Sequence, residues 1–276
     1  MSGSSARYGT LLCFLLLATV SCRTIPVTPA AGLDLGLWHL NEELLYRYWA
    51  MAEAAWREQE QFRNAPWELD YFGFEETATL AVAIHYEEAY HIAFRATLDR
   101  TGSPDQLLNL YIIPRRPRYL DFETNVRAHS GYLARYESVR TELLRRVFAH
   151  RDKPVILIGA SAGGALATLA FEEVRRLAPD VDVRLITYSA PRVLTRATQR
   201  MLTDEEDRIV RVVYANDIVP ALPPSFMGYR HLGPQVQIGR DRSLVPLSIR
   251  DHHPGTRAAL RNLREGAGVD RDDTGY

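Results

Sequence analysis

The chain has 276 residues, of which 46% are hydrophobic and 24% are charged, and its formal net charge is −1. This length allows one large domain with its own core. The near-neutral charge argues against a nucleic-acid partner, which requires a basic excess on one face. We therefore expect no nucleic-acid partner. We also expect a monomer.

Residues 1–21 have the features of a secretory signal peptide. Arg7 precedes the apolar run Leu11–Val20, and the small residue Ser21 follows. A simple membrane anchor is the alternative, but this run is shorter than the roughly twenty apolar residues that a spanning helix needs. The pattern favours export of the protein.

The run Ala18–Cys22 resembles the lipobox of bacterial lipoproteins, with Thr19 in place of the usual leucine. This resemblance implies that Cys22 is the lipidated first residue of an exported protein held at the membrane of the bacterial cell envelope. Residues 22–36 then form a proline-containing tether. The only other cysteine is Cys13, within the signal, so no disulfide is expected.

From residue 37 to residue 276 we predict one domain. Apolar residues recur at helical spacing over 37–63, and two β-like runs follow at 77–86 and 89–97, joined by a tight turn. Residues 99–122 contain three prolines and read as irregular. We expect the aromatic stripe of the first helix to pack in the core.

A helix is predicted from about residue 131 to residue 150. Strands then alternate with helices: a strand over 154–159 leads into a helix, and further strands follow at 181–189, 208–215 and 234–239. Such alternation indicates an α/β fold with a mostly parallel central sheet flanked by helices.

The pattern Gly-x-Ser-x-Gly at residues 159–163 surrounds Ser161 with small residues, after an aliphatic strand and before an amphipathic helix. This context predicts a nucleophile elbow, a sharp strand-to-helix turn in which bulky neighbours would collide. The N–H of Ala162 would face a developing oxyanion at the helix N-terminus. A tightly packed glycine turn is the structural alternative.

A serine nucleophile needs a histidine base that an acid orients, in the chain order serine, acid, histidine for this fold. Asp217 follows a hydrophobic strand, at the end where functional residues of parallel sheets gather. The weaker acid candidates are Asp180, Asp182, Asp204 and Asp207. The histidines after Ser161 are His231, His252 and His253.

The segments "GASAGGALA", "TYSAPRV", "NDIVPALPP" and "GYRHLG", in this order, resemble the class 3 lipase family, which includes the fungal triacylglycerol lipases. Upstream, "IAFRAT" resembles the strand that ends in the family's oxyanion residue, and "RAHSGYLARY" resembles the segment after it. The resemblance covers roughly residues 77–260 and implies an α/β-hydrolase fold.

Carried over by position, the resemblance implies that Ser161 is the nucleophile and Asp217 the acid. It also implies that Thr97 and the N–H of Ala162 form the oxyanion hole. His252 takes the place of the base in "IRDHHPG", with His253 as the alternative. His129 and His231 match structural positions. Ala160 and Ala96 replace the family's usual histidine and glycine, which bears on rate and preference more than on the chemistry.

The family has a mobile lid after its oxyanion residue, in the slot that Ser103–Ile113 occupies here. We call these residues the flap segment. Its leucines and isoleucines suit a flap with one apolar face, and ordinary core packing is the alternative.

Together these features predict a serine esterase without metal or cofactor that cleaves lipid esters through an acyl-enzyme. Triacylglycerols or smaller acylglycerols are the expected substrates, and phospholipase A or general carboxylesterase activity is the alternative. A non-catalytic surface lipoprotein with a hydrolase-like fold is the alternative from another class.

Overall fold

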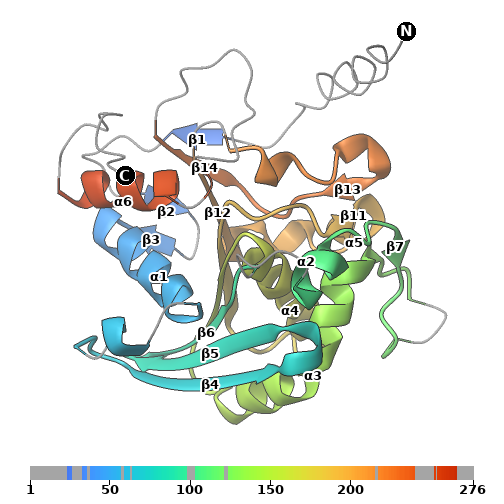
Figure 1. Cartoon of the computed structure of the whole chain (residues 1–276), viewed down its shortest axis with the longest axis horizontal. Coiled ribbons are helices and arrows are strands. Elements are labelled where there is room, and N and C mark those ends of the chain that lie inside the picture. Colours follow the sequence, from blue (N-terminus) through green and yellow to red (C-terminus); the bar gives the residue numbers. More distant parts are fainter. Residues whose placement is uncertain are drawn as a thin grey trace, which may run out of the picture.

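The computed structural model describes residues 24–26, 33–35, 38–56, 59–62, 64–97, 103–120, 124–214, 217–239, 252 and 254–265. In these ranges, an eight-stranded sheet lies between two layers of helices (Figure 1). The strands follow the order β1-β14-β12-β10-β9-β6-β5-β4. They are β1 (Thr24–Pro26), β4 (Glu68–Phe74), β5 (Thr79–Tyr86), β6 (Ala89–Phe94), β9 (Val155–Ala160), β10 (Val183–Tyr188), β12 (Ile209–Tyr214) and β14 (Gln235–Ile238).

Six helices accompany this sheet in the described ranges: α1 (Glu42–Ala54), α2 (Pro104–Asn109), α3 (Ser130–Ala149), α4 (Ala162–Leu177), α5 (Arg196–Arg200) and α6 (Pro254–Arg264). Short strands form two smaller sheets: β2 (Leu33–Leu35) with β3 (Trp38–Leu40), and β7 (Pro114–Arg115), β8 (Ala128–His129), β11 (Leu194–Thr195) and β13 (Tyr229–Arg230). Single 3₁₀ turns are η2 (Gln59–Phe62), η3 (Glu75–Thr77), η4 (Thr203–Arg208), η5 (Val219–Ala221) and η6 (Ser225–Met227).

The strands from β6 to β14 and β1 pair in parallel, whereas β4, β5 and β6 pair antiparallel. The prediction of an α/β fold with a mostly parallel sheet is thus confirmed. In the antiparallel part, β5 and β6 form the expected hairpin, and its turn contains Glu87 at a φ of 54°.

Both faces of the sheet are covered, which explains the unbroken aliphatic run of β9. Val155 and Leu157 belong to the core on the side of α3 and α4. Ile156 and Ile158 alternate with them and pack on the other side, with α1 and α6. Because successive strand residues point to opposite faces, a strand buried on both sides is apolar throughout.

Helix α1 is shorter than the predicted helix over 37–63. It begins at Glu42, because the side chain of Asn41 accepts a hydrogen bond from the Leu44 N–H (2.8 Å) and caps the first turn. The preceding residues form β3 instead. The predicted aromatic stripe does pack in the core, where Trp49 is fully buried and contacts Tyr188 of β10 edge to face.

Several elements were not predicted, among them β4 and α2. Strand β4 lies at the sheet edge and buries only Phe72 fully, so its sequence has no strong apolar alternation. Helix α2 lies in the region expected to be irregular, and it is only six residues long. Elements this short give little periodic signal.

His129 caps helix α3, where its Nδ1 accepts a hydrogen bond from the Tyr132 N–H (3.4 Å). Burial lowers the pKa of this imidazole to about 4. The histidine in the unfolded chain titrates near 6.5, so acid protonates the unfolded chain first. Stability is therefore present above about pH 6.5 and is lost as the pH falls from there towards 4.

We expect His129→Asn, which keeps a capping acceptor but cannot be protonated, to lose less stability in acid than the wild type. From the two pKa values, His129 alone costs about 2 kcal/mol at pH 5 relative to pH 8. Urea unfolding at both pH values measures the difference. His85→Asn, at an exposed position of β5, is the control. An equal acid loss in His129→Asn and wild type would contradict the prediction.

Candidate active site

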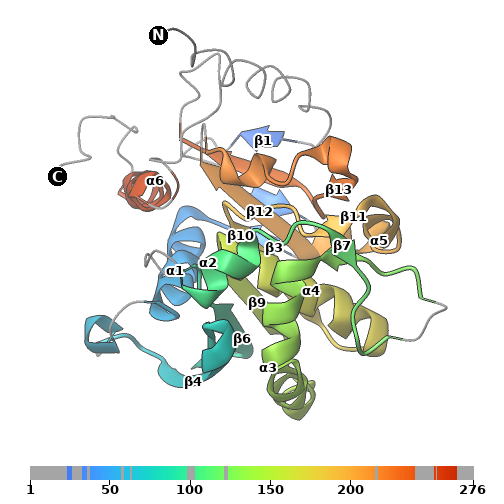
Figure 2. The ribbon, with the colours of Figure 1, turned by 45° about the vertical axis from the view of Figure 1, so that its right-hand side comes forward.

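Ser161 lies in the turn between the end of β9 and the start of α4, both near the centre of the molecule (Figure 2). Its backbone has φ 52° and ψ −128°, a conformation that is costly for a residue with a side chain. Hydrogen bonds from the Ser161 N–H to the Tyr188 carbonyl (2.9 Å) and from the Gly164 N–H to the Ser161 carbonyl (2.9 Å) hold it. The serine is partly exposed.

The glycines around Ser161 are required by close approach of the backbone. A Cβ on Gly163 would lie 2.2 Å from the Phe94 carbonyl oxygen at the end of β6. A Cβ on Gly159 would lie 2.3 Å from the carbonyl of Gly163 itself. No side chain fits at either place, so β6, β9 and α4 can meet at the serine only with glycine there.

Asp217 and His252 are in contact, although 35 residues separate them. His252 Nδ1 lies 2.7 Å from Asp217 Oδ2, and the other carboxylate oxygen accepts a hydrogen bond from the Val219 N–H (2.9 Å). The Asp217 side chain is fully buried, whereas His252 is 12% exposed. A buried carboxylate beside an imidazole fixes its orientation and tautomer.

Helix α6 holds His252 in place. The Thr256 hydroxyl donates to the His252 carbonyl (2.8 Å). Arg257 forms an ion pair with Glu53 of α1, with Nε 2.7 Å from the carboxylate. Helices α1 and α6 lie side by side (Figure 1), so the position of the imidazole depends on the packing of the helix layer as well as on the sheet.

The two residues predicted for the oxyanion hole flank the same turn. Ala162 is the first residue of α4, directly after Ser161. Thr97 follows β6, whose end touches Gly163. The Thr97 Oγ1 accepts a hydrogen bond from Asn109 Nδ2 of α2 (2.8 Å).

The competing candidates lie elsewhere. Asp182 pairs with Arg184 and Arg208 (2.8 and 2.9 Å), and Asp180, Asp204 and Asp207 are exposed. His231 is bonded through Nε2 to the Pro220 carbonyl (2.7 Å). His253 and Cys22 lie outside the described residues.

Most of the large apolar side chains of the flap segment lie outside the core, and Leu108 alone among them is half-buried. Leu107, Leu110 and Ile113 are 53%, 74% and 76% exposed, and Tyr111 and Ile112 are exposed as well. The alternative that these side chains are ordinary core is therefore wrong. They form an apolar surface around α2.

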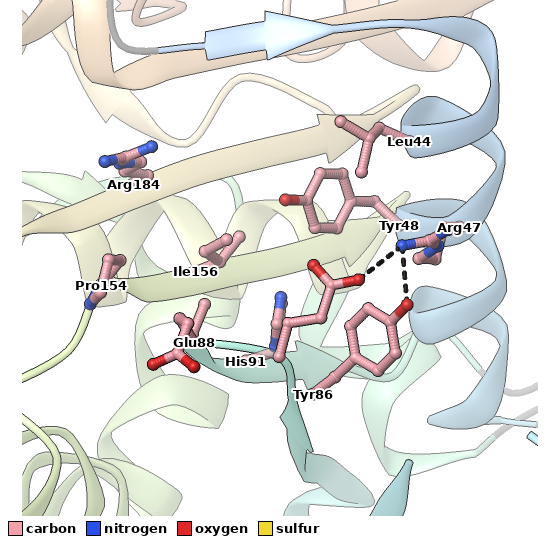
Figure 3. Close-up of a pocket in the computed structure, with 11 residues that line it drawn as sticks. Leu44, Arg47, Tyr48, Tyr86, Glu88, His91, Pro154, Ile156 and Arg184 are labelled. Carbon is pink, nitrogen blue, oxygen red and sulfur yellow. Dashed lines mark hydrogen bonds and ion pairs between the residues drawn. The ribbon is translucent and has the colours of Figure 1, made fainter. Parts of the chain in front are cut away.

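Figure 3 shows the residues that line a cavity of about 220 Å³. Because Pro154 and Ile156 are among them, the cavity lies near the start of β9, and Ser161 follows the other end of this strand. The walls of the cavity include Tyr48 and Arg47 of α1, His91 of β6 and Pro154, the residue before β9. Because β9 has six residues and a strand rises about 3.3 Å per residue, this cavity is roughly 20 Å from the serine. It takes no part in the arrangement described above.

Several residues that support the site were missed by sequence reasoning. Asn109 donates a hydrogen bond to Thr97, and Arg135 donates one to Asn109. Thr256 donates one to the backbone of His252. Arg135 gives the one recognisable signal, because it lies on a helix face that otherwise carries buried residues such as Tyr132 and Val139.

Within the described ranges, no three His, Cys, Asp or Glu side chains are grouped so that they could hold a metal ion. No helix among the described residues combines the length and the apolar composition needed to cross a bilayer.

The chain is similar to known lipases. Residues 91–227 match the family model described as "Lipase (class 3)". Lipase A of Sodiomyces alcalophilus is 30% identical over 198 residues, which cover 60% of this chain and 46% of that protein. The secreted mono- and diacylglycerol lipase 1 of Fusarium solani is 33% identical over 111 residues, covering 39% of this chain and 33% of that protein. The matches thus span less than half the length of these curated relatives.

Solved lipase structures share the fold. A fungal lipase–inhibitor complex superposes with a TM-score of 0.66 at 21% identity, covering 79% of this chain and 94% of that chain. The lipase of Rhizopus microsporus var. chinensis superposes with a TM-score of 0.60 at 19% identity, covering 91% of this chain and 94% of that chain.

We expect Gly163→Ala to be destabilised by at least about 2 kcal/mol, because the added methyl group must push the end of β6 away from α4. The serine and the segment leading to Thr97 would separate, so reactivity of the serine should fall as well. Denaturant unfolding measures the first effect and the rate of serine labelling the second. A variant with wild-type stability and reactivity would show that the close approach is not needed.

Proposed function

We propose that the protein is a serine hydrolase of the class 3 lipase family that cleaves carboxylic esters of lipids, because residues 91–227 match the model of that family. Acylglycerols are the proposed substrates. The names of the relatives support this choice, since two of them are a lipase and a secreted mono- and diacylglycerol lipase.

The observation that carries the proposal is the contact of His252 Nδ1 with the buried carboxylate of Asp217 (2.7 Å). Ser161 is the only serine of the sequence in a Gly-x-Ser-x-Gly pattern. With Nδ1 donating to the carboxylate, Nε2 has a lone pair to accept a proton. This is the state that a general base needs before the reaction.

In the proposed mechanism, His252 takes the proton of Ser161 while the serine oxygen attacks the ester carbonyl. The negative charge of the tetrahedral intermediate is stabilised by the N–H of Ala162 and by the N–H and hydroxyl of Thr97. His252 then gives its proton to the leaving alcohol, and an acyl-enzyme remains. Water, activated by the same imidazole, releases the fatty acid.

Phospholipase activity is the second candidate. A chloroplastic phospholipase A(1) of Arabidopsis thaliana is 32% identical over 107 residues. Acylglycerols and phospholipids present the same ester to the serine and differ in the group beyond it, so one set of catalytic residues can serve both.

We also propose that the protein is exported, with residues 1–21 removed, Cys22 lipidated and residues 22–36 leading into a single catalytic domain. The predicted tether is not wholly outside that domain, because Thr24–Pro26 (β1) pairs with β14 and Leu33–Leu35 (β2) pairs with β3. The support for export and lipidation is the signal-like start and the lipobox-like run of the sequence. Such an anchor would hold the enzyme beside membrane lipids.

Ser161→Ala is expected to lose all labelling by a fluorophosphonate probe, which reacts only with an activated serine. Ester hydrolysis should fall by at least about 10³-fold, with the melting temperature unchanged. Failure of the wild-type protein to react with the probe or hydrolyse any ester in detergent would favour the non-catalytic lipoprotein instead.

The base is identified by comparing His252→Ala with His253→Ala under the same conditions. We expect only the first to be inactive, and Asp217→Asn to lose about 10⁴-fold in kcat, because the imidazole is then held in the wrong tautomer. An inactive His253→Ala beside an active His252→Ala would reassign the base.

Among ester substrates, we expect dioctanoylglycerol to be cleaved with higher kcat/KM than dioctanoylphosphatidylcholine, which carries the same acyl chains. The comparison is made in mixed micelles with one detergent, so that all lipids are presented alike. Faster cleavage of the phosphatidylcholine would establish the phospholipase alternative.

A further inference from the structure

The cavity of about 220 Å³ lies at the edge of the sheet where β6, β9 and β10 begin (Figure 3). These three strands run parallel and their starts are in register, since Tyr90 and Val183 both pair with Val155. Helix α1 packs against β6 and β9 and contributes Tyr48 to the walls. The functional residues of parallel sheets gather at the other, carboxyl edge, so the cavity is separate from the site of Ser161.

His91 of β6 is a buried polar residue with an unsatisfied ring nitrogen. The residue is 3% exposed, and its Nδ1 has no hydrogen-bond partner among the described residues. Burial lowers the pKa of the imidazole to about 4, a shift that a hydrogen bond with the Ile84 backbone opposes only in part. The ring is therefore neutral at neutral pH. It lines the cavity and has hydrogen-bonding capacity that a ligand can use.

Tyr48 lies beside His91 in the wall of the cavity, with 5.9 Å between the ring centroids. Figure 3 shows its phenol extending from α1 towards the strands. Burial raises the pKa of Tyr48 to about 12, so the hydroxyl stays protonated. A phenol can both donate and accept a hydrogen bond, and a neutral imidazole does so through its two nitrogens. Hydroxyl groups of a ligand match this pair because they, too, can donate or accept.

The two arginines in the walls are already held by acidic residues. Arg47 donates to the Glu87 carboxylate (3.1 Å), as Figure 3 shows, and Arg184 forms an ion pair with Asp182 (2.8 Å). The carboxylate of Glu88 is exposed, where solvent and salt screen its charge. A charged ligand would have to compete with one of these ion pairs, whereas a neutral ligand leaves them intact.

The rest of the cavity is apolar and small. Its walls include Leu44, Pro154 and Ile156. The volume of about 220 Å³ is below the roughly 300–1,000 Å³ of pockets for drug-sized ligands. A matching ligand is therefore a single ring or a short chain, with hydroxyl groups on a compact carbon frame that can contact the apolar walls.

We propose that this cavity is a binding site for a small neutral polyol, of the size of a single sugar ring, whose hydroxyl groups bind His91 and Tyr48. The carbon frame of the ligand lies against Ile156. This inference does not rest on the proposed function, because it uses none of the residues assigned to ester cleavage.

Titration of the full chain with glucose tests the proposal, since glucose is a single uncharged ring that carries several hydroxyl groups. In NMR spectra of the histidine side chains, one ring resonance should shift with glucose and saturate. A Kd in the millimolar range is expected for so small a ligand. The same resonance should be missing in His91→Phe. Absence of any saturating shift up to about 100 mM glucose would overturn the proposal.

The charge of the ligand is tested with glucosamine and glucuronate, which keep the sugar ring and add a positive or a negative charge. We expect both to bind at least about 10-fold more weakly than glucose, because each has to compete with an existing ion pair. Tighter binding of either one than of glucose would contradict the assignment to a neutral ligand.

Tyr48→Phe removes only a hydroxyl group from the walls. We expect glucose to bind this variant about 5-fold more weakly, as the loss of one hydrogen bond predicts. Tyr46→Phe, on the same helix but outside the walls, is the matched control and should bind glucose like the wild type. Equal affinities of Tyr48→Phe and the wild type would show that glucose does not occupy this cavity.

His91→Phe should bind no glucose and should melt no lower than the wild type, because the unpartnered nitrogen is replaced by carbon. Ser161→Ala should bind glucose with wild-type affinity. A wild-type protein that binds glucose but cleaves no ester would therefore refute the proposed function alone. An active enzyme without a saturating glucose response would refute this inference alone.

Discussion

The site depends on the close meeting of three backbones at Ser161. The end of β6, the end of β9 and the first turn of α4 approach within distances that only Gly159 and Gly163 permit. This contact brings the segment that follows β6 close to Ser161 and to the N-terminal N–H groups of α4. It also forces Ser161 into its uncommon backbone conformation, which the surrounding hydrogen bonds must hold.

The other candidate catalytic residues come from segments that lie far from Ser161 in the sequence. The sheet supplies Asp217 at the end of β12, whereas His252 arrives from the loop before α6 and is tied to α1 through Arg257 and Glu53. The cost of burying the Asp217 carboxylate is offset by two hydrogen-bonded contacts, one to the Val219 N–H and one to the imidazole. Removing either contact would leave the carboxylate poorly satisfied.

Local physics explains which features could be predicted from the sequence. The elbow could be recognised because its glycines and its flanking strand and helix are adjacent in the chain. Asp217 could be proposed because parallel strands deliver their carboxyl ends to one edge. His252 was selected over His253 by resemblance to a family and not by any property of its own.

The features that were missed are those decided by tertiary contacts. Strand β4 is a strand because β5 offers it a pairing edge, and α2 is a helix of six residues docked on Gly131. Nothing local distinguishes Asn109 from a surface asparagine, since its hydrogen-bond partner Arg135 lies 26 residues later in the chain. A buried arginine can be suspected from its apolar neighbours, but its partners cannot be read from the sequence.

The flap segment combines buried charge on its inner side with apolar side chains on its outer side, and magnitudes indicate how it would meet a lipid. Removing one partner of a buried ion pair such as that of Asp105 and Arg135 costs about 3–5 kcal/mol, because the other charge is left buried and unpaired. Burying one exposed leucine gains about 1.5–3 kcal/mol. Leu107, Leu110 and Ile113 already face outward, so a lipid surface can cover them without breaking any inner contact. The two sides of α2 therefore differ in chemistry, with a buried ion pair to α3 on one side and exposed apolar side chains on the other.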